Sequence, residues 1–206
     1  MTRMAEMEQA DAAIPGRVGP NAVLQLVAAL EENGLGRRVL PLFAAAGAVE
    51  WLRRPPASMV DERRVARLHQ TLRSCFTQAQ SQRLLEDAGL RTANYLLHAR
   101  IPRWVQQVLK RLPPALAARV LVAAIRKNAW TFAGSGRFTA RVGRTVTIRI
   151  EGNPFCAGEM AAIPVCHWHC AVFQHLFEVL VSPTTRVVET HCEAACGSAC
   201  CFEISW

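Results

Sequence analysis

The hydrophobic period of the chain changes once, between Gly134 and Gly136, and this change sets the class of fold. Before it, apolar residues recur at the three- and four-residue spacing of amphipathic helices. After it, residues 137–142 and 146–150 alternate between apolar and polar, which predicts a hairpin with one buried face. Helices followed by a mainly antiparallel sheet with a crossing helix make an α+β domain.

Helix-breaking residues divide the first part of the chain into separate helices. Asn21 is expected to cap a helix that runs to about Asn33 and is stopped by Gly34. Gly89 weakens a later helix, and two consecutive prolines interrupt the pattern at residues 113–114. The further helices are expected over residues 37–47, 60–76, 77–99, 102–112 and 115–132.

The length of 206 residues, with 51% hydrophobic and 19% charged residues, suits one substantial folded core. Residues 1–19 have mixed charges and lack the apolar core of a signal peptide, so we expect a flexible N-terminal arm. Residues 20–206 are expected to form a single domain, with a helical part over 20–133 and a sheet part over 134–206.

The longest stretch without Asp, Glu, Lys or Arg is Met160–Phe177, and its histidines and proline argue against a membrane span. Without an export signal, the eight cysteines are expected to be reduced thiols or metal ligands, not disulfides. The expected location is the cytoplasm, with peripheral contact at a membrane as a second location.

Charge divides the chain into two unlike parts. Residues 1–150 hold 23 Lys and Arg against 10 Asp and Glu, whereas residues 151–206 hold one Arg against six Glu. The basic part suits nucleic acid, an anionic membrane surface, or an acidic ligand or partner, and its charges also suit ordinary solvated helix faces. Because the arginines are scattered and no helix-turn-helix pattern is present, we do not expect nucleic-acid binding.

Six of the eight cysteines lie within the last 41 residues. Three of them, together with a glutamate, provide thiolates and a carboxylate, which are the donors of a tetrahedral divalent ion such as zinc. The simpler interpretation is that these cysteines are small buried hydrophobes, as free cysteines often are. The four candidate ligands are Cys166, Glu189, Cys192 and Cys200.

The local patterns around these residues are consistent with a shared site. Residues 200–206 alternate as a half-buried strand that points Cys200 inward and Cys201 outward. Cys166 begins a helical stretch, where the helix dipole favours a thiolate. Glu189 and Cys192 have opposite parity, so the strand that contains Glu189 must end or bulge near residue 190 for both to reach one ion.

A Cys-x-Trp that opens a hydrophobic helix, a Val-x-Glu-x-x-Cys, a Gly-containing loop and a Cys-x-Phe together resemble the 4-vinyl reductase domain. The resemblance extends over most of the chain and is greatest to members of bacteriochlorophyll synthesis. It implies the ligand-binding fold shared with nitric-oxide-signalling and Golgi-transport proteins, often dimeric. One departure is a glycine missing near residues 169–171. In phenol sensors with this domain three cysteines and a glutamate hold zinc, which implies the ligands Cys166, Glu189, Cys192 and Cys200.

The resemblance also ties the chain to the 8-vinyl group (4-vinyl in older nomenclature) of divinyl chlorophyll precursors. Reduction of that group needs a source of electrons, and the sequence has neither a Rossmann fingerprint nor a flavin signature. A closed four-ligand zinc site is structural. The only spacing that approaches an iron–sulfur pattern is that of Cys192, Cys196, Cys200 and Cys201.

We therefore interpret the chain as an accessory protein of bacteriochlorophyll biosynthesis with a structural zinc. It would bind a Mg-porphyrin or divinyl (proto)chlorophyllide and present it to pathway enzymes such as Mg-chelatase or a methyltransferase. One alternative is an 8-vinyl reductase that uses an external reductant. Another alternative is a small-molecule sensor module.

A tetrapyrrole needs an apolar slot, cations for its carboxylates and an axial donor for Mg. The aromatic candidates are Trp104, Trp130 and Phe132. The cationic candidates are Arg100, Arg103, Arg126 and Lys127. The axial candidates, each of which is also typical of an ordinary surface or core histidine, are His98, His167 and His169.

Overall fold

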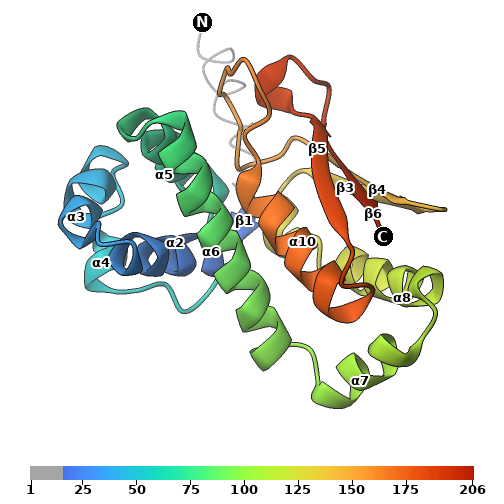
Figure 1. Ribbon diagram of the computed structural model, residues 1–206. Helices are drawn as coiled ribbons and strands as arrows, with labels where there is room; N and C mark the ends of the chain where they lie inside the picture. Colours follow the sequence, from blue (N-terminus) through green and yellow to red (C-terminus); the bar gives the residue numbers. More distant parts are fainter. Residues whose placement is uncertain (1–15) are drawn as a thin grey trace, which may run out of the picture.

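The computed structural model describes residues 16–206, and its helices and strands occupy different sides of the molecule (Figure 1). The predicted α+β class is confirmed. The helices of the first part are α2 (Asn21–Glu32), α3 (Gly36–Ala45), α4 (Glu50–Arg53), α5 (Glu62–Cys75), α6 (Gln78–Ala99), α7 (Arg103–Arg111), α8 (Pro114–Lys127) and α9 (Trp130–Ala133).

Most predicted helix boundaries are confirmed by local capping. Gly34 takes a positive φ of 74° just after the C-cap of α2, and the Asp61 side chain accepts a hydrogen bond from the Arg63 backbone N–H at the start of α5. The expected capping role of Asn21 is wrong, because α2 begins one residue after Pro20 and has no side-chain cap. The helix expected over residues 115–132 is two helices, because the chain leaves α8 after Lys127 before α9 begins.

The N-terminal end of the described chain is paired. β1 (Arg17–Val18) forms an antiparallel ladder with β2 (Val60–Asp61). Residues 1–15 of the expected flexible arm lie outside the described residues, and its last residues include β1.

The main sheet contains β3 (Arg137–Val142), β4 (Val146–Glu151), β5 (Arg186–His191) and β6 (Cys200–Ser205) in the order β3-β4-β6-β5. All neighbours are antiparallel, and the predicted β3–β4 hairpin is confirmed. Along β4 and β6 buried residues alternate with more exposed ones, and Ile150 pairs with Cys200 in the central register. The sheet therefore buries one face.

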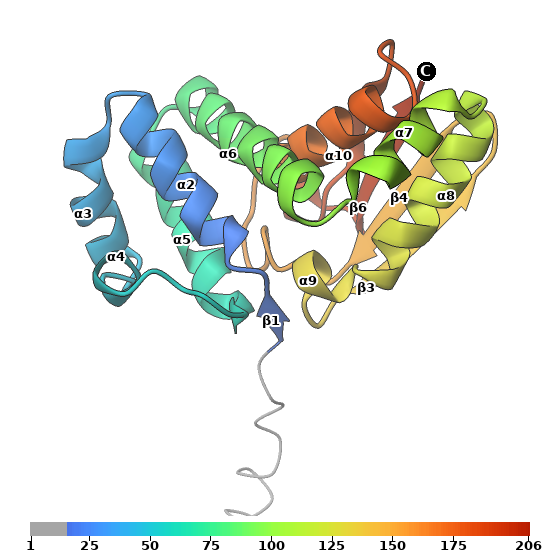
Figure 2. The same ribbon diagram turned by 90° about the horizontal axis from the view of Figure 1, so that it is seen from below.

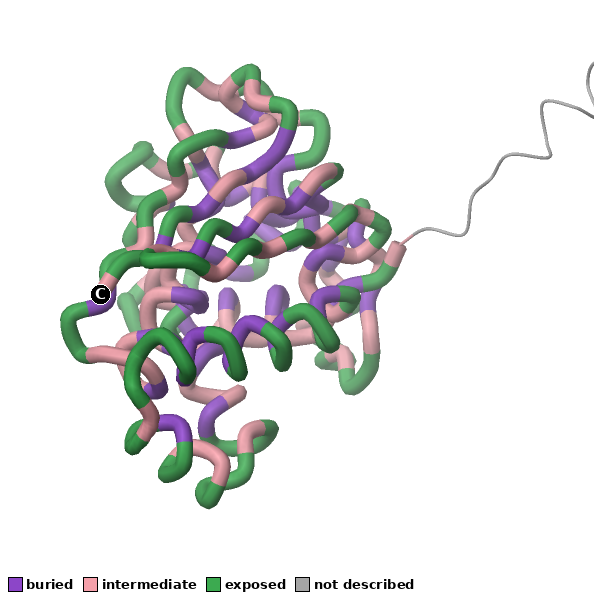
Figure 3. Tube along the Cα trace, turned by 90° about the vertical axis from the view of Figure 1, so that its right-hand side faces the viewer, coloured by how far each residue is buried: buried purple, intermediate pink, exposed green. Residues whose placement is uncertain are grey.

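The crossing helix α10 (His167–Leu180) packs between the sheet and α6 (Figures 1 and 2). Its Phe173 ring lies 5.4 Å from the ring of Phe202 on β6, in an edge-to-face arrangement. In Figure 3 buried and exposed positions alternate along the trace, as expected for elements that each present one face to the core. None of the helices in residues 16–206 is both long and apolar enough to cross a membrane.

The α6–α10 contact depends on Gly89. A Cβ added at this glycine would lie 2.5 Å from the Trp168 carbonyl oxygen and 2.8 Å from the Ala171 Cβ, closer than real side chains approach. The glycine that the family resemblance places in α10 is thus absent, and the small residue that allows close packing lies on α6 instead. The residue that weakens α6 as an isolated helix is required where the two helices meet.

Candidate metal centre

Four cysteine sulfurs form a buried cluster at one end of the sheet. The Sγ atoms of Cys156, Cys166, Cys192 and Cys200 all lie within 4.8 Å of one another. They come from four separate places in the fold: the loop before α10, the N-cap of α10, the end of β5 and the first residue of β6. All eight cysteines are free thiols, so the cluster is not a pair of disulfides.

Three of these sulfurs have the spacing of a tetrahedral site. Cys166 lies 3.5 Å from Cys200 and 3.8 Å from Cys192, and Cys192 lies 3.8 Å from Cys200. A tetrahedral zinc with Zn–S bonds of about 2.3 Å separates its sulfur ligands by about 3.8 Å. The structure thus brings together three of the four predicted ligands at the distances that zinc requires.

Glu189, the fourth predicted ligand, lies beside the same cluster. Its Oε2 atom accepts a hydrogen bond of 2.8 Å from the Cys166 backbone N–H, and its Oε1 atom is buried without a partner among the described residues. The predicted irregularity near residue 190 is confirmed, because the β5–β6 register shifts between Glu189 and His191. An unpartnered carboxylate oxygen next to three thiols is suited to a cation.

Cys156 is a further member of the cluster that the sequence did not indicate. Its Sγ lies 3.5 Å from that of Cys200. The loop that carries it is fixed by the Glu193 carboxylate, which accepts hydrogen bonds from the backbone N–H groups of Gly152 and Asn153 at 2.6 and 2.8 Å. The cluster therefore offers a fifth donor beside the four predicted ligands.

Two side chains hold this loop against the rest of the cluster. Asn153 is fully buried, and its Nδ2 atom donates to the Cys166 Sγ at 3.3 Å. Arg73 on α5 forms an ion pair with Glu159 and donates to the Phe155 carbonyl oxygen at 2.8 Å. Such surrounding hydrogen bonds orient metal ligands and are typical of sites that bind an ion.

Proton affinities in the cluster show why it needs a cation. The neighbouring Cys156 thiol and burial raise the pKa of Cys166 and of Cys200, whereas hydrogen bonds from neighbouring thiols, Cys156 first among them, lower the pKa of Cys192. Burial and the adjacent Cys192 raise the pKa of Glu189 to about 9. Without a cation, therefore, negative charge concentrates on one thiolate. A divalent ion would compensate the charge of all the ligands.

These observations fit a zinc ion held by protein atoms alone. The cluster is buried, and four donors complete a tetrahedron, which is the arrangement of structural zinc sites. The iron–sulfur spacing is not supported, since Cys196 is exposed and Cys201 faces away from the cluster. The predicted inward orientation of Cys200 and outward orientation of Cys201 are confirmed.

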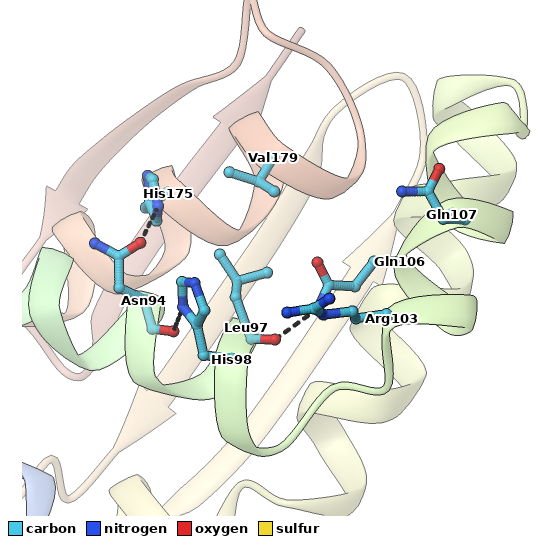
Figure 4. Close-up of a pocket in the computed structure, with 8 residues that line it drawn as sticks. All are labelled: Asn94, Leu97, His98, Arg103, Gln106, Gln107, His175 and Val179. Carbon is cyan, nitrogen blue, oxygen red and sulfur yellow. Dashed lines mark hydrogen bonds between the residues drawn. The ribbon is translucent and has the colours of Figure 1, made fainter.

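A second feature is a pocket of about 360 Å³ between α6, α7 and α10 (Figure 4). His98 and Arg103, two of the predicted ligand contacts, lie on its wall together with His175. The Nδ1 atom of His98 lies 2.7 Å from the Asn94 carbonyl oxygen, whereas His175 Nε2 lies 2.9 Å from the Asn94 side-chain oxygen. A proton on His98 Nδ1 leaves its Nε2 atom as an acceptor. The complete lining is Asn94, Leu97, His98, Arg103, Gln106, Gln107, His175 and Val179.

The other predicted ligand contacts are dispersed. Trp104 and Trp130 are exposed on different helices, and Phe132 packs against Phe138 and Phe173 in the core. His169 is buried within aromatic rings. Burial lowers the pKa of His169 to about 3 and, less strongly, the pKa of His167.

The remaining cationic candidates also lie apart from the pocket. Arg100 packs over the Tyr95 ring, and Arg126 donates a hydrogen bond to the Ala140 carbonyl oxygen. Lys127 is exposed at the end of α8. Of the candidates from sequence, only His98 and Arg103 share this pocket within the described part of the chain.

The sheet, the crossing helix and the thiol cluster define a protein of the 4-vinyl reductase domain class, and residues 146–205 match the model of that domain. The chain is 45% identical over 195 residues to the bacteriochlorophyll synthase 23 kDa chain of Cereibacter sphaeroides, covering 93% of this chain and 92% of that protein. It is 40% identical over 186 residues to the protein of the same name from Rhodobacter capsulatus, covering 90% and 85%. The chain belongs to the family of these 23 kDa chains, and the predicted family is confirmed.

Among solved structures, the fold is similar to a trafficking protein particle complex subunit 3 from Naegleria fowleri, covalently bound to palmitic acid. The two chains are 10% identical, with a TM-score of 0.42 over 88% of this chain and 93% of that one.

Proposed function

We propose that this chain acts in bacteriochlorophyll biosynthesis by binding a Mg-tetrapyrrole intermediate and presenting it to enzymes of the pathway. The observation that carries this proposal is the 45% identity to a bacteriochlorophyll synthase 23 kDa chain along nearly the whole length of both proteins. Enzymes that insert magnesium or methylate the product, such as Mg-chelatase and a methyltransferase, are the proposed recipients.

The metal site is proposed to hold zinc through Cys166, Glu189, Cys192 and Cys200. Three sulfur–sulfur distances of 3.5–3.8 Å and the unpartnered Glu189 oxygen support this ligand set. Such an ion would join the start of α10 to β6 and to the end of β5. Its role would be to stabilise the fold, because metal binding to a closed protein site is coupled to folding.

The pocket of Figure 4 is the proposed place for the polar edge of the pigment. Its volume of about 360 Å³ lies at the lower end of the usual range for small-molecule sites. Arg103 would pair with a carboxylate of the tetrapyrrole. His98 would supply Nε2 to the Mg, since a histidine that donates its other N–H to a backbone carbonyl is oriented as a metal ligand.

Titration with Mg-protoporphyrin and with divinyl protochlorophyllide tests the proposal. We expect a saturable change in pigment absorbance or fluorescence at micromolar concentration, equivalent to about 8 kcal/mol of binding free energy. His98→Ala should weaken binding and remove the part of the spectral change that depends on axial coordination. The matched control is His191→Ala, an exposed histidine on β5 outside the pocket. No saturable change with either pigment would contradict the proposal.

A catalytic assay separates binding from reduction. The protein is incubated with divinyl protochlorophyllide and either NADPH or reduced ferredoxin, and the vinyl and ethyl products are resolved by chromatography. The binding proposal expects no turnover by the isolated chain. Turnover that depends on one of these reductants would replace this proposal with an 8-vinyl reductase that uses an external electron donor.

A further inference from the structure

A long segment in the middle of the chain contains no acidic residue. From Ala88 to Ile150 there are 12 Lys and Arg but no Asp or Glu. This segment includes all of α7 and α8, two consecutive helices that lie side by side at one end of the molecule (Figures 1 and 2). Its positive charge is therefore not compensated by acidic residues of the same segment.

Both helices expose large apolar side chains in the i, i+4 arrangement that places them on one helix face. On α7, Trp104 is 70% exposed and Val108 is 50% exposed. On α8, Leu116 is 45% exposed and Val120 is 48% exposed. Each helix also has an opposite, buried side, so these residues are surplus to the core. We call these four residues and the exposed cations of the same two helices the α7–α8 surface.

The cations beside these apolar residues lack acidic partners. Six Lys and Arg lie on α7 and α8, all of them exposed, and none takes part in an ion pair within residues 16–206. Two of them donate to backbone carbonyl oxygens instead, Arg126 to Ala140 and Arg111 to Gln107. The cations of the α7–α8 surface are Arg103, Lys110, Arg111, Arg119, Arg126 and Lys127.

We infer that the α7–α8 surface binds an anionic lipid bilayer. Exposed Trp and aliphatic side chains flanked by Lys and Arg are the composition of helices that lie in a membrane interface, where the apolar groups enter and the cations remain at the headgroups. This inference goes beyond the proposed function, because it concerns a surface outside the pigment pocket, apart from Arg103.

Other occupants suit the surface less well. A second copy of the chain would oppose cations with cations, which is unfavourable. A protein partner commonly requires a pocketed apolar centre, and lysine is depleted from such interfaces. Here the apolar residues stand on two helix ridges among lysine and arginine, which complements a diffuse negative surface.

Vesicle co-sedimentation of the full chain tests this inference without any pigment. The wild type should bind vesicles that contain phosphatidylglycerol, should not bind phosphatidylcholine alone, and should be released by high salt. Arg111→Gln and Arg119→Gln should each weaken partitioning about fivefold, because each cation near an anionic surface contributes about that factor. Trp104→Ala should also weaken it.

Matched controls lie on α3, at the opposite end of the molecule (Figure 2). Arg37→Gln removes an exposed cation and Leu40→Ala an exposed apolar residue, and neither should change vesicle binding. His98→Ala should also bind vesicles normally, which separates this inference from the pigment proposal. No binding to anionic vesicles, or equal losses from the α3 and α7–α8 variants, would overturn it. Salt-sensitive capture by an acidic protein without vesicle binding would likewise overturn it.

Discussion

Replacement of Gly89 by alanine tests the close contact between α6 and α10. The new Cβ would lie 2.5 Å from the Trp168 carbonyl oxygen, so the helices must separate by at least about 0.5 Å to reach an acceptable contact. Overpacking of this kind costs about 1–3 kcal/mol, and the preference of helices for alanine over glycine offsets about 0.5–1 kcal/mol. The expected net loss is about 1–2 kcal/mol in the free energy of unfolding.

For a chain of this length, that loss corresponds to a fall of about 2–8 °C in Tm. Urea denaturation and thermal unfolding, both followed by circular dichroism, measure the effect. The control is Gly36→Ala at the start of α3, where an added Cβ meets no atom within 4 Å, and its stability should be unchanged or slightly higher. A Gly89→Ala protein as stable as the Gly36→Ala protein would refute the close packing of α6 on α10.

Three further changes probe the metal centre and the core. Cys200→Ala should release the metal and lower stability by several kcal/mol, whereas Cys201→Ala, on the outward face, should keep both, as measured by elemental analysis and urea denaturation. Asn153→Ala should keep the metal but weaken its affinity about 10–100-fold in chelator competition, because the Cys166 sulfur loses a hydrogen bond. His169 has its pKa lowered to about 3, so its neutral form stabilises the fold above about pH 6.5, and this contribution is lost as the pH falls toward 3. His169→Phe should therefore shift acid unfolding to lower pH, and an unchanged acid midpoint would contradict the assignment.

The elements that depend on local pattern could be predicted from the sequence. Alternation placed Cys200 inward and Cys201 outward, and the parity of Glu189 and Cys192 required the irregularity that the structure shows after Glu189. These predictions succeed because side-chain direction in a strand follows from the backbone alone.

Features that depend on distant contacts could not be predicted in this way. Cys156 lies in a loop whose position is set by Glu193 and by Arg73, which are 37 residues after it and 83 residues before it in the printed sequence. Similarly, Gly89 was expected only to weaken its helix, because its contact with Trp168 arises from tertiary packing. A cysteine that directly follows the aromatic Phe155 gave no signal beyond its residue type.

The α7–α8 surface lies between these cases. The absence of acidic residues from Ala88 to Ile150 is visible in the sequence, but helical spacing alone predicted ordinary core-facing helices. The exposure of Trp104 and Val108 follows only from the way α7 packs. The sequence therefore indicated positive charge without indicating the apolar residues that accompany it.

X-ray absorption at the zinc edge, combined with metal analysis of the purified protein, tests the central claim most directly. The account predicts about one zinc per chain, with three sulfur ligands at about 2.3 Å and one oxygen ligand at about 2.0–2.2 Å. Four sulfur ligands without oxygen would give Cys156 the place of Glu189 and contradict the proposed ligand set. Protein that is folded and stable without any bound metal would contradict the metal centre itself.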